Sequence, residues 1–477
     1  MLPGKLVSLL LGLIFGGLLL ALPPMKVFMI VVGLGVALTL IRKPLWGLLI
    51  FAVLATSIPY TTLQLGIRTT ISEAVLGLTW AGVFWQSFIG KTRGFMVWRP
   101  TERALMWLML FSTIPFIWGM IIIHAEGNGP VNWVRWLMNL SLLFIVPLLL
   151  RTDADRDKVV VALLLGNLAM LSLSIFMFLK TRNAMSMIDI LTDLKYAHPE
   201  AVKDIFSANY KRMASPWVHP NLTGGVLVLF IPLALFYGWT RTGWRRALGL
   251  AVAVLGCAGL LLSISRGAIV ALALILIWLT YKRVPHSGRI IGIGVAFVIA
   301  LVMFYPPLQD RLMTMFSTTN ASTEIRFDEY AGFPDVMAKY PLGIGFKIDP
   351  PVPGSNLLGI SNLWLNFIYK IGIPGMLLFI AVTVLWWREV RPLGSVRKVT
   401  ADNALWLGCV CGVLAALLTG IFDHYFSFTF VLIALFWLLM GISLQQVRLN
   451  PTVTASAPVS VSVSVSVSVS VPKDSQP

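Results

Sequence analysis

The stretch "LLLSISRGAIVALALI", residues 260–275, places one arginine, Arg266, between two apolar runs that are each long enough to enter a bilayer. A transmembrane helix needs about 20 predominantly apolar residues, and runs of this kind recur along the chain. Hydrophobic residues make up 57% of the sequence and charged residues only 12%, a composition that excludes the soluble globular classes. The sequence therefore predicts a multi-pass membrane protein.

The apolar runs predict an all-α, polytopic bundle of about 12–14 transmembrane helices. Residues 1–90 are expected to form an N-terminal group of spans, beginning with an uncleaved first span. Residues 91–444 are expected to form the main transmembrane region, which carries the chemistry. Residues 445–477 turn polar and end in the repeat "VSVSVSVSVSVSV", which predicts a disordered cytoplasmic tail.

Lysine and arginine exceed aspartate and glutamate by 37 to 20, which gives a net charge of +17. In a soluble protein this excess would suggest nucleic acid, but here it follows the inward bias of basic residues in the loops of membrane proteins. We therefore expect membrane lipids and no nucleic acid as partners, and both termini in the cytoplasm if fourteen helices span. The basic connectors fall at every second loop, at residues 42–43, 91–103, 151–158, 241–246, 282–289 and 388–398.

Two of the alternate connectors, residues 180–220 and 307–361, are long and polar and lie on the predicted outer side. Functional residues concentrate on such loops. Residues 307–361 hold six acidic and four basic residues, so basic residues there are not surplus inward-facing charge. The segment "HPEAVKDIFSANYKRM", residues 198–213, predicts a short helix on the membrane surface.

Arg266 is predicted to lie at the outer membrane boundary, beside the start of a helix. One interpretation is an arginine whose side chain reaches lipid phosphates. A cation at a helix N-terminus is mildly repelled by the helix dipole unless an anion is also present. Arg266 is therefore better suited to binding an anion.

A second cluster, "YKRMASPWVHPNLTGG" at residues 210–225, ends the first outer loop. Asn221 is a suitable N-cap for the next span. His219 is a candidate base or hydrogen-bond donor, with a structural histidine as the alternative. Arg212 is a candidate second anion ligand, with a solvated surface charge as the alternative.

Arg326 lies in the second outer loop, on a predicted amphipathic helix that ends at Pro341 and is followed by the turn signal Gly343-Ile344-Gly345. The alternative to an anion-binding role is a local ion pair with Glu329 at i+3, which stabilises an exposed helix by only about 0.2–0.5 kcal/mol.

These pieces together resemble the O-antigen ligase and O-antigen polymerase family of bacterial membrane glycosyltransferases. The resemblance covers roughly residues 200–445 and rests on the order, sidedness and spacing of motifs that are each weak alone. The matching motifs are Ser265-Arg266-Gly267-Ala268, His219-Pro220-Asn221, Arg326 in a long outer loop, "YPLGIG", and "SNLWLNFIYKIGIPG".

The resemblance implies transfer of a glycan from an undecaprenyl-diphosphate carrier to an acceptor hydroxyl on the outer side of the bacterial plasma (inner) membrane, in surface polysaccharide biosynthesis. The partners would be a lipid-linked oligosaccharide donor and a glycan or lipid-glycan acceptor. Arg266 and Arg326 would hold the diphosphate, since two guanidiniums can stabilise a diphosphate leaving group without a cofactor. No metal or other cofactor is expected, because the outer side lacks the aspartate clusters of magnesium-dependent transferases.

The sequence departs from the family at Ser361-Asn362, where many members have His-Asn and the histidine is credited with activating the acceptor. Serine is not an effective general base at neutral pH. Asp423-His424 in the last outer turn is one substitute and His219 is another. The alternatives are a reaction without a dedicated base, a different acceptor, or an inactive member. We expect catalytic roles for Arg266, Arg326, Asp423 and His424, and substrate binding by a second set of residues: Arg212, His219, Asn221, Ser361 and Asn362.

The main rival from another functional class is a lipid-linked sugar transporter or flippase. That class predicts internal repeats and ionisable groups near the bilayer midplane, whereas the charged residues here gather at the outer boundary. A structural scaffold is the third option and leaves the long outer loops unexplained. Polymerase and ligase share the same donor and leaving group, so the sequence leaves both open.

Overall fold

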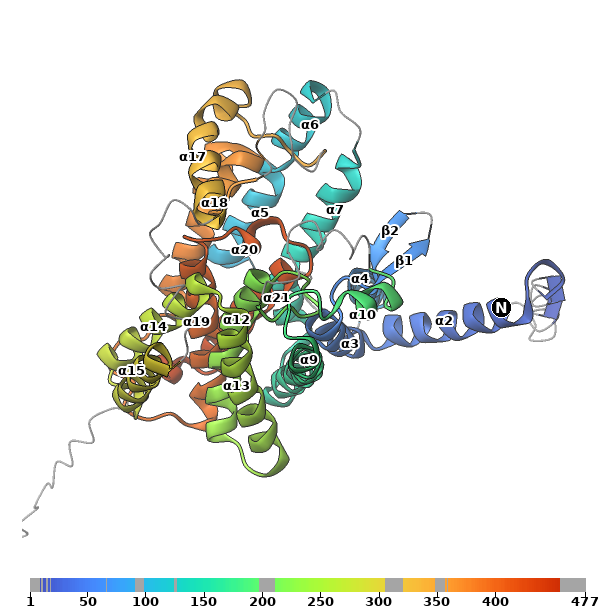
Figure 1. Cartoon of the computed structure of the whole chain (residues 1–477). Coiled ribbons are helices and arrows are strands. Elements are labelled where there is room, and N and C mark those ends of the chain that lie inside the picture. Colours follow the sequence, from blue (N-terminus) through green and yellow to red (C-terminus); the bar gives the residue numbers. More distant parts are fainter. Residues whose placement is uncertain are drawn as a thin grey trace, which may run out of the picture.

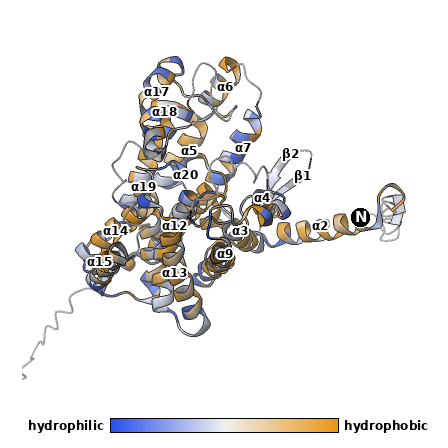
Figure 2. Ribbon diagram, viewed as in Figure 1, coloured by the Kyte–Doolittle hydropathy of each residue, from blue (hydrophilic) through white to orange (hydrophobic). Residues whose placement is uncertain are grey.

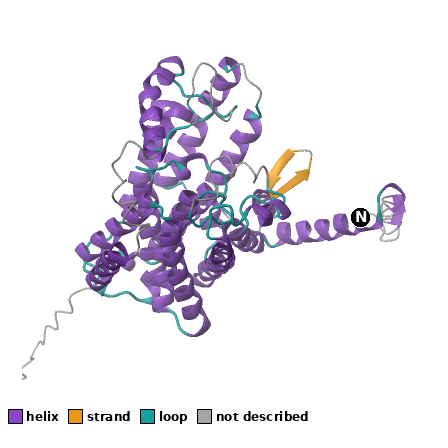
Figure 3. Cartoon of the chain, in the orientation of Figure 1, coloured by secondary structure: helices purple, strands orange, loops and turns teal. Residues whose placement is uncertain are grey.

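The computed structural model describes residues 19–65, 67–90, 98–123, 127–196, 211–304, 321–347 and 359–454, with a few isolated positions outside these ranges. Helices make up 78% of the structure (Figure 3), and the prediction of an all-α polytopic membrane bundle is confirmed. Within these ranges, nine helical segments are long and apolar enough to cross a membrane. They are α2 (Pro24–Arg42), α5–α6 (Pro100–Phe111 and Thr113–Ile122), α7–α8 (Gly129–Leu140 and Leu142–Leu149), α9 (Asp153–Thr181), α12 (Pro220–Thr240), α13 (Gly243–Ser263), α18 (Leu363–Val390), α19 (Ala401–Thr419) and α21 (Leu432–Leu449).

Three apolar helices are shorter: α3 (Pro44–Ser57), α14 (Arg266–Tyr281) and the apolar part of α15 (Ser287–Phe304). With the nine longer segments they bring the described chain to twelve, the lower end of the predicted range. The second long connector contains α17 (Ala321–Lys339), where a helix ending at Pro341 is predicted. The first contains α10 (Ile188–Asp193), which was not predicted. The predicted surface helix at residues 198–213 and the Val-Ser tail fall largely or wholly outside the described residues.

A two-stranded hairpin was not predicted. Strands β1 (Thr62–Leu65) and β2 (Ile67–Thr70) pair antiparallel with Thr62 opposite Thr70, and they connect α3 to α4 (Ile71–Phe88). Thr70 ends the hairpin and also caps α4, because its side chain accepts the Glu73 backbone N–H while Glu73 reaches back to the Thr70 backbone. The hairpin therefore sets the start of α4 at the end of the bundle that carries the long loops.

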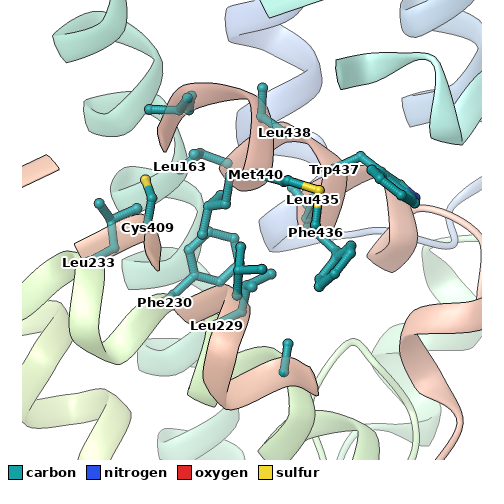
Figure 4. Close-up of a cluster of buried hydrophobic side chains, with 14 of the residues drawn as sticks. Leu163, Leu229, Phe230, Leu233, Cys409, Leu435, Phe436, Trp437, Leu438 and Met440 are labelled. Carbon is teal, nitrogen blue, oxygen red and sulfur yellow. The ribbon is translucent and has the colours of Figure 1, made fainter. Parts of the chain in front are cut away.

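Helix α12 lies at the centre of the bundle and packs against α13 and α19. Leu229, Phe230 and Leu233 of α12 gather with Cys409 of α19 and Met440 of α21 in the buried cluster of Figure 4. Glycines allow the backbones to approach closely at these crossings. A Cβ atom on Gly412 of α19 would lie only 2.2 Å from the Leu229 carbonyl oxygen of α12.

The basic connectors meet at one end of the bundle. Arg245 at the start of α13 pairs with Asp157 of α9, with Nη1 2.9 Å from Oδ2. Arg448 at the end of α21 forms ion pairs with both Glu102 of α5 and Glu389 of α18. These contacts bring together the ends of α5, α9, α13, α18 and α21 that the sequence assigns to the inner side.

The opposite end carries the long loops. Figure 1 shows α17 beside α18 and α6 at the top of the molecule, with α20 (Tyr425–Phe428) between this group and the helices α12 and α14 below. Figure 2 shows that α17 is richer in hydrophilic residues than the spanning helices around it. The polar residues with candidate roles therefore lie where the helix ends meet the loops.

Replacing Gly412 with alanine should destabilise the protein by about 1–3 kcal/mol, because the new methyl group must displace the backbone of α12. Thermal unfolding in detergent measures the change. Gly292→Ala in α15 is the matched control, since a Cβ atom there meets no atom within 4 Å. Alanine favours helix there, so the control should be neutral or slightly stabilising. Equal effects of the two substitutions would contradict the close packing at Gly412.

Candidate functional site

The junction between α13 and α14 presents Arg266 as the first residue of α14. Ile264 takes a left-handed conformation (φ 49°) that ends α13, and Ser265 is the N-cap of α14. Gly224 of α12 lies directly against this junction, since a Cβ atom on it would come within 2.4 Å of the Ser265 side chain. The sequence placed Arg266 at such a helix start, and the structure has it there, half-buried.

Arg212 is only 5% exposed, so the alternative of a solvated surface charge is wrong. Its Nε donates to the Ser263 carbonyl oxygen at 2.6 Å, and its Nη2 contacts the Asn221 side-chain oxygen and the Ile264 carbonyl oxygen. These acceptors belong to the end of α13 and the start of α12. Arg212 therefore ties the first outer loop to the junction that carries Arg266.

His219, not Asn221, is the N-cap of α12, which corrects the N-cap predicted from the sequence. The His219 Nδ1 accepts the Asn221 backbone N–H at 3.0 Å, and Pro220 occupies the first helical position. Burial lowers the pKa of His219 to about 3, with the Arg212 cation and His424 adding to the effect. His219 is therefore neutral at neutral pH and, with Nδ1 accepting, carries its proton on Nε2.

The turn that follows α19 joins the two halves of the site. Phe422 packs against Gly267, the residue after Arg266, since a Cβ atom on Gly267 would lie 2.9 Å from the Phe422 Cβ. Tyr425 packs in the same way against Gly225 of α12. Beyond it, Ser427 accepts from the Asn366 side-chain nitrogen at 2.7 Å and anchors α20 to α18. The turn is thereby held against the starts of both α12 and α14.

Arg326 of α17 reaches the same turn. Its Nη2 lies 3.7 Å from Asp423 Oδ2, with the arginine side chain 27% and the aspartate side chain 13% exposed. The Arg326 Nε is buried and has no hydrogen-bond partner among the residues that the structure describes. This guanidinium therefore keeps donor capacity for an anionic ligand.

Glu329 does not serve as the local partner that the sequence allowed for Arg326. Its carboxylate accepts the Ser361 backbone N–H at 2.7 Å and the Ser361 hydroxyl at 3.2 Å. Tyr330 donates its hydroxyl to the Ser361 carbonyl oxygen at 3.3 Å. Ser361, predicted as a substrate-binding residue, thus holds α17 against the start of α18.

Asn362 is the N-cap of α18. Its side-chain oxygen accepts the backbone N–H groups of Trp364 and Leu365, and its side-chain nitrogen donates to the Ile421 carbonyl oxygen at 3.1 Å. Asn362 therefore connects α18 to the turn that carries Asp423 and His424.

The Gly-x-Gly signal at residues 343–345 forms a turn that docks α17 onto α18. The Ile344 and Gly345 N–H groups each donate at 2.9 Å to carbonyl oxygens of Tyr369 and Lys370. These oxygens are accessible because α18 is kinked at Gly372, which has a φ of 72°. The kink motif "IGIPG" can be recognised in the sequence. Its contact with the turn at residues 343–345 cannot be inferred from the sequence.

Burial shifts the pKa values of both titratable side chains of the turn, Asp423 and His424. Burial raises the pKa of Asp423 to about 6, although the Tyr425 hydrogen bond and the Arg326 cation oppose the rise. Burial lowers the pKa of His424 to about 4, with Lys370 contributing, and its Nδ1 is buried without a hydrogen-bond partner in the described part of the chain. At neutral pH the site therefore combines an ionised Asp423 with a neutral His424.

The structure brings Arg326, Asp423 and His424 to one turn and Arg212, His219 and Asn221 to the helix junction beside it. Glu329 and Tyr425 also belong to this region and were not among the residues selected from the sequence. For Glu329, the sequence signal that could have pointed to a role was its i, i+3 spacing from Arg326. Within the described ranges, no group of three or more His, Cys, Asp or Glu side chains is arranged to hold a metal ion.

The neutral state of His219 predicts a pH-dependent stability. Because its pKa in the folded protein lies below the ordinary value of about 6.5, stability present above that pH is lost as the pH falls toward 3. His219→Asn keeps a capping side chain but removes this titration. Between pH 7 and 5 the wild type should lose about 1–2 kcal/mol more than the variant in unfolding experiments. Asp423 and His424 titrate in both proteins and cancel in the difference; parallel pH profiles would contradict a buried, neutral His219.

Part of the chain is similar to a known protein family. Residues 250–380 match the family model described as O-antigen ligase. No curated protein matches the chain. The matched region includes Arg266, Arg326, Ser361 and Asn362, and it lies inside the helical bundle of this chain. The match supports an assignment to the O-antigen ligase and polymerase family of membrane glycosyltransferases.

Proposed function

We propose that the protein transfers a glycan from an undecaprenyl-diphosphate carrier to an acceptor hydroxyl on the outer side of the bacterial plasma membrane. The observation that carries this proposal is the contact of one turn, residues 422–424, with both arginine-bearing elements. Phe422 packs on Gly267 next to Arg266, and Asp423 pairs with Arg326. The two cations named from the sequence thus meet at the same end of the bundle.

The proposed membrane side of the candidate site rests on the distribution of basic residues between the two ends of the bundle. The basic connectors gather at the opposite end, where Arg245 and Arg448 are paired with carboxylates. Basic connectors favour the cytoplasmic side, which supports an outer position for the candidate site and, if fourteen helices span, a cytoplasmic position for both termini. A lipid-linked donor would reach the site from the outer leaflet.

The reaction requires a stable leaving group. When the acceptor oxygen attacks the anomeric carbon, the bond to the lipid diphosphate breaks and negative charge gathers on the phosphate oxygens. Arg266 at the start of α14 and Arg326, whose side chain is 27% exposed beside Asp423, would donate to these oxygens. Cations and hydrogen-bond donors placed where charge develops stabilise the transition state.

Asp423 holds Arg326 before the donor arrives. A buried guanidinium without a partner is costly, so the carboxylate keeps it oriented toward the site. A diphosphate carries more charge than one carboxylate and would take over donors of Arg326. Asp423 is then a positioning residue for the diphosphate-binding arginine.

The other residues form the acceptor side. His219 would donate from Nε2, and His424 lies beside Asp423 in the same turn. Arg212, Asn221 and Asn362 form bonds to the protein that shape the walls of the site. A polymerase would extend a glycan here and a ligase would transfer it to a lipid-linked glycan acceptor, and both use the same leaving group.

Arg266→Ala and Arg326→Ala should each lower transfer by about 10²–10³-fold, the typical cost of losing a donor to developing charge. The measurement is release of lipid diphosphate in proteoliposomes supplied with the lipid-linked glycan of the source cell and a chelator of divalent metals. Arg246→Ala, an exposed arginine at the opposite end, is the matched control and should retain activity. Full activity in both outer variants would refute the proposal, and glycan movement without diphosphate release would favour a transporter.

Transfer should decline as the pH falls through about 6, because protonation of Asp423 removes the charge that orients Arg326. Asp423→Asn should show low transfer that stays flat from pH 7.5 to 5.5, since no carboxylate remains to titrate at this position. The pH–rate profiles of the two proteins test this. An unchanged acid limb in the variant would assign the titration to another group.

A further inference from the structure

Glu329 lies one helical turn beyond Arg326 on α17, so the two side chains project from the same face of the helix. Both of its carboxylate oxygens are held by Ser361: the backbone N–H donates to Oε2 at 2.7 Å and the hydroxyl to Oε1 at 3.2 Å. Tyr330 adds a hydrogen bond to the Ser361 carbonyl oxygen. We call these three residues the Ser361 clasp.

The clasp positions a part of α17 that apolar packing does not hold. The C-terminal half of the helix is buried through Val336, which joins Tyr340, Ile344 and Tyr369 in an apolar cluster. In the N-terminal half, Ile325 and Phe327 are exposed. The described polar contacts of this half include the clasp, a hydrogen bond of Tyr330 with Asn362, and the ion pair of Arg326 with Asp423. The orientation of Glu329 is therefore fixed by hydrogen bonds to both of its oxygens.

The clasp leaves Glu329 able to accept further hydrogen bonds. An ionised carboxylate has about four lone-pair sites, two on each oxygen, and Ser361 occupies one on each. The neighbouring candidates for a proton acceptor are engaged or enclosed. His219 Nδ1 accepts a backbone N–H, Asp423 faces Arg326, and His424 Nδ1 is buried.

We propose that Glu329 is the general base that takes the proton from the acceptor hydroxyl, and that Ser361 is the positioning residue that orients its carboxylate. This inference rests on the proposed transfer from a lipid diphosphate. The acceptor O–H bond breaks and its proton passes to a Glu329 oxygen while the acceptor oxygen bonds to the anomeric carbon. The bond from that carbon to the diphosphate breaks, and its electron pair leaves on the diphosphate oxygen. The protonated Glu329 then returns its proton to water.

The spacing of the two residues suits this displacement. Side chains at i and i+3 start about 5–6 Å apart on a helix surface. In a single displacement the attacking and departing oxygens lie on opposite sides of one carbon. Arg326 would hold the departing diphosphate while Glu329, from the same helix, receives the proton of the attacking hydroxyl, and the configuration at the anomeric carbon is inverted.

The test compares Glu329→Gln with the matched control Asp328→Asn, which neutralises the exposed carboxylate next to it on α17. Glutamine keeps the size of the side chain and an oxygen for Ser361. Glu329→Gln should lower kcat by about 10²–10⁴-fold, the usual contribution of a general base. The donor KM and the binding of undecaprenyl diphosphate should remain within about threefold of wild type, because the base acts on the acceptor. Asp328→Asn should remain close to wild type in every measurement.

A second pair of measurements separates catalysis from folding. Glu329→Ala should regain transfer when formate or azide is added, because a small anion can take the vacated position. Ser361→Ala should lower kcat by a smaller factor, and Ser361→Thr, which retains a hydroxyl, should recover part of it.

Three outcomes would overturn the inference. Glu329→Gln with a kcat within about threefold of wild type would exclude a base there, while leaving the proposed transfer intact. If Glu329→Gln loses undecaprenyl diphosphate binding in parallel with transfer, Glu329 has a structural role and is not the base. A wild-type protein that releases no lipid diphosphate from the true donor would remove both the inference and the function on which it rests.

Discussion

The constraint that governs this structure is the absence of water in the hydrocarbon core. Each backbone N–H and C=O group there needs a partner within the protein, which leaves helices as the means by which this chain can cross. Charged side chains are costly at that depth and move to the helix ends. The consequence is visible in α12, which is buried along nearly its whole length and has its polar residues near its two ends.

The candidate site is therefore assembled from helix starts and helix ends. Arg266 begins α14, His219 caps α12, Asn362 caps α18, and Asp423 follows α19. Small residues bring these ends into direct contact, most clearly where Gly224 meets Ser265 and Gly267 meets Phe422. A larger residue at either glycine would separate the elements that carry the two arginines. The site depends as much on these contacts as on its charged groups.

Buried charge is handled differently at the two ends of the bundle. At the basic end, Arg448 is held between Glu102 and Glu389, so that each charge is compensated by the protein. At the site, Arg326 retains a buried Nε without a partner among the described residues, and Asp423 has a pKa raised to about 6 by burial. Incomplete compensation is unfavourable for stability, and it leaves donor capacity for a charged ligand. The first arrangement ties helices together, and the second is suited to binding.

Several features of this protein follow from the sequence alone. The helical class, the two-sided distribution of charge, and the positions of Arg266 at a helix start and of Arg326 on a loop helix are encoded locally. Hydrophobic periodicity and charge bias can each be recognised within one transmembrane segment and its adjoining loops, without knowledge of the segments around it.

Only the tertiary structure determined which helix ends contact one another. Asn221 looked like the cap of α12, but packing gives the cap to His219 and uses Asn221 to bind Arg212. Glu329 looked like a local partner of Arg326, yet it binds Ser361, 32 residues away in the chain, while Arg326 binds Asp423. Side chains choose partners by distance in space, and that distance is set by helix crossings that no local pattern encodes.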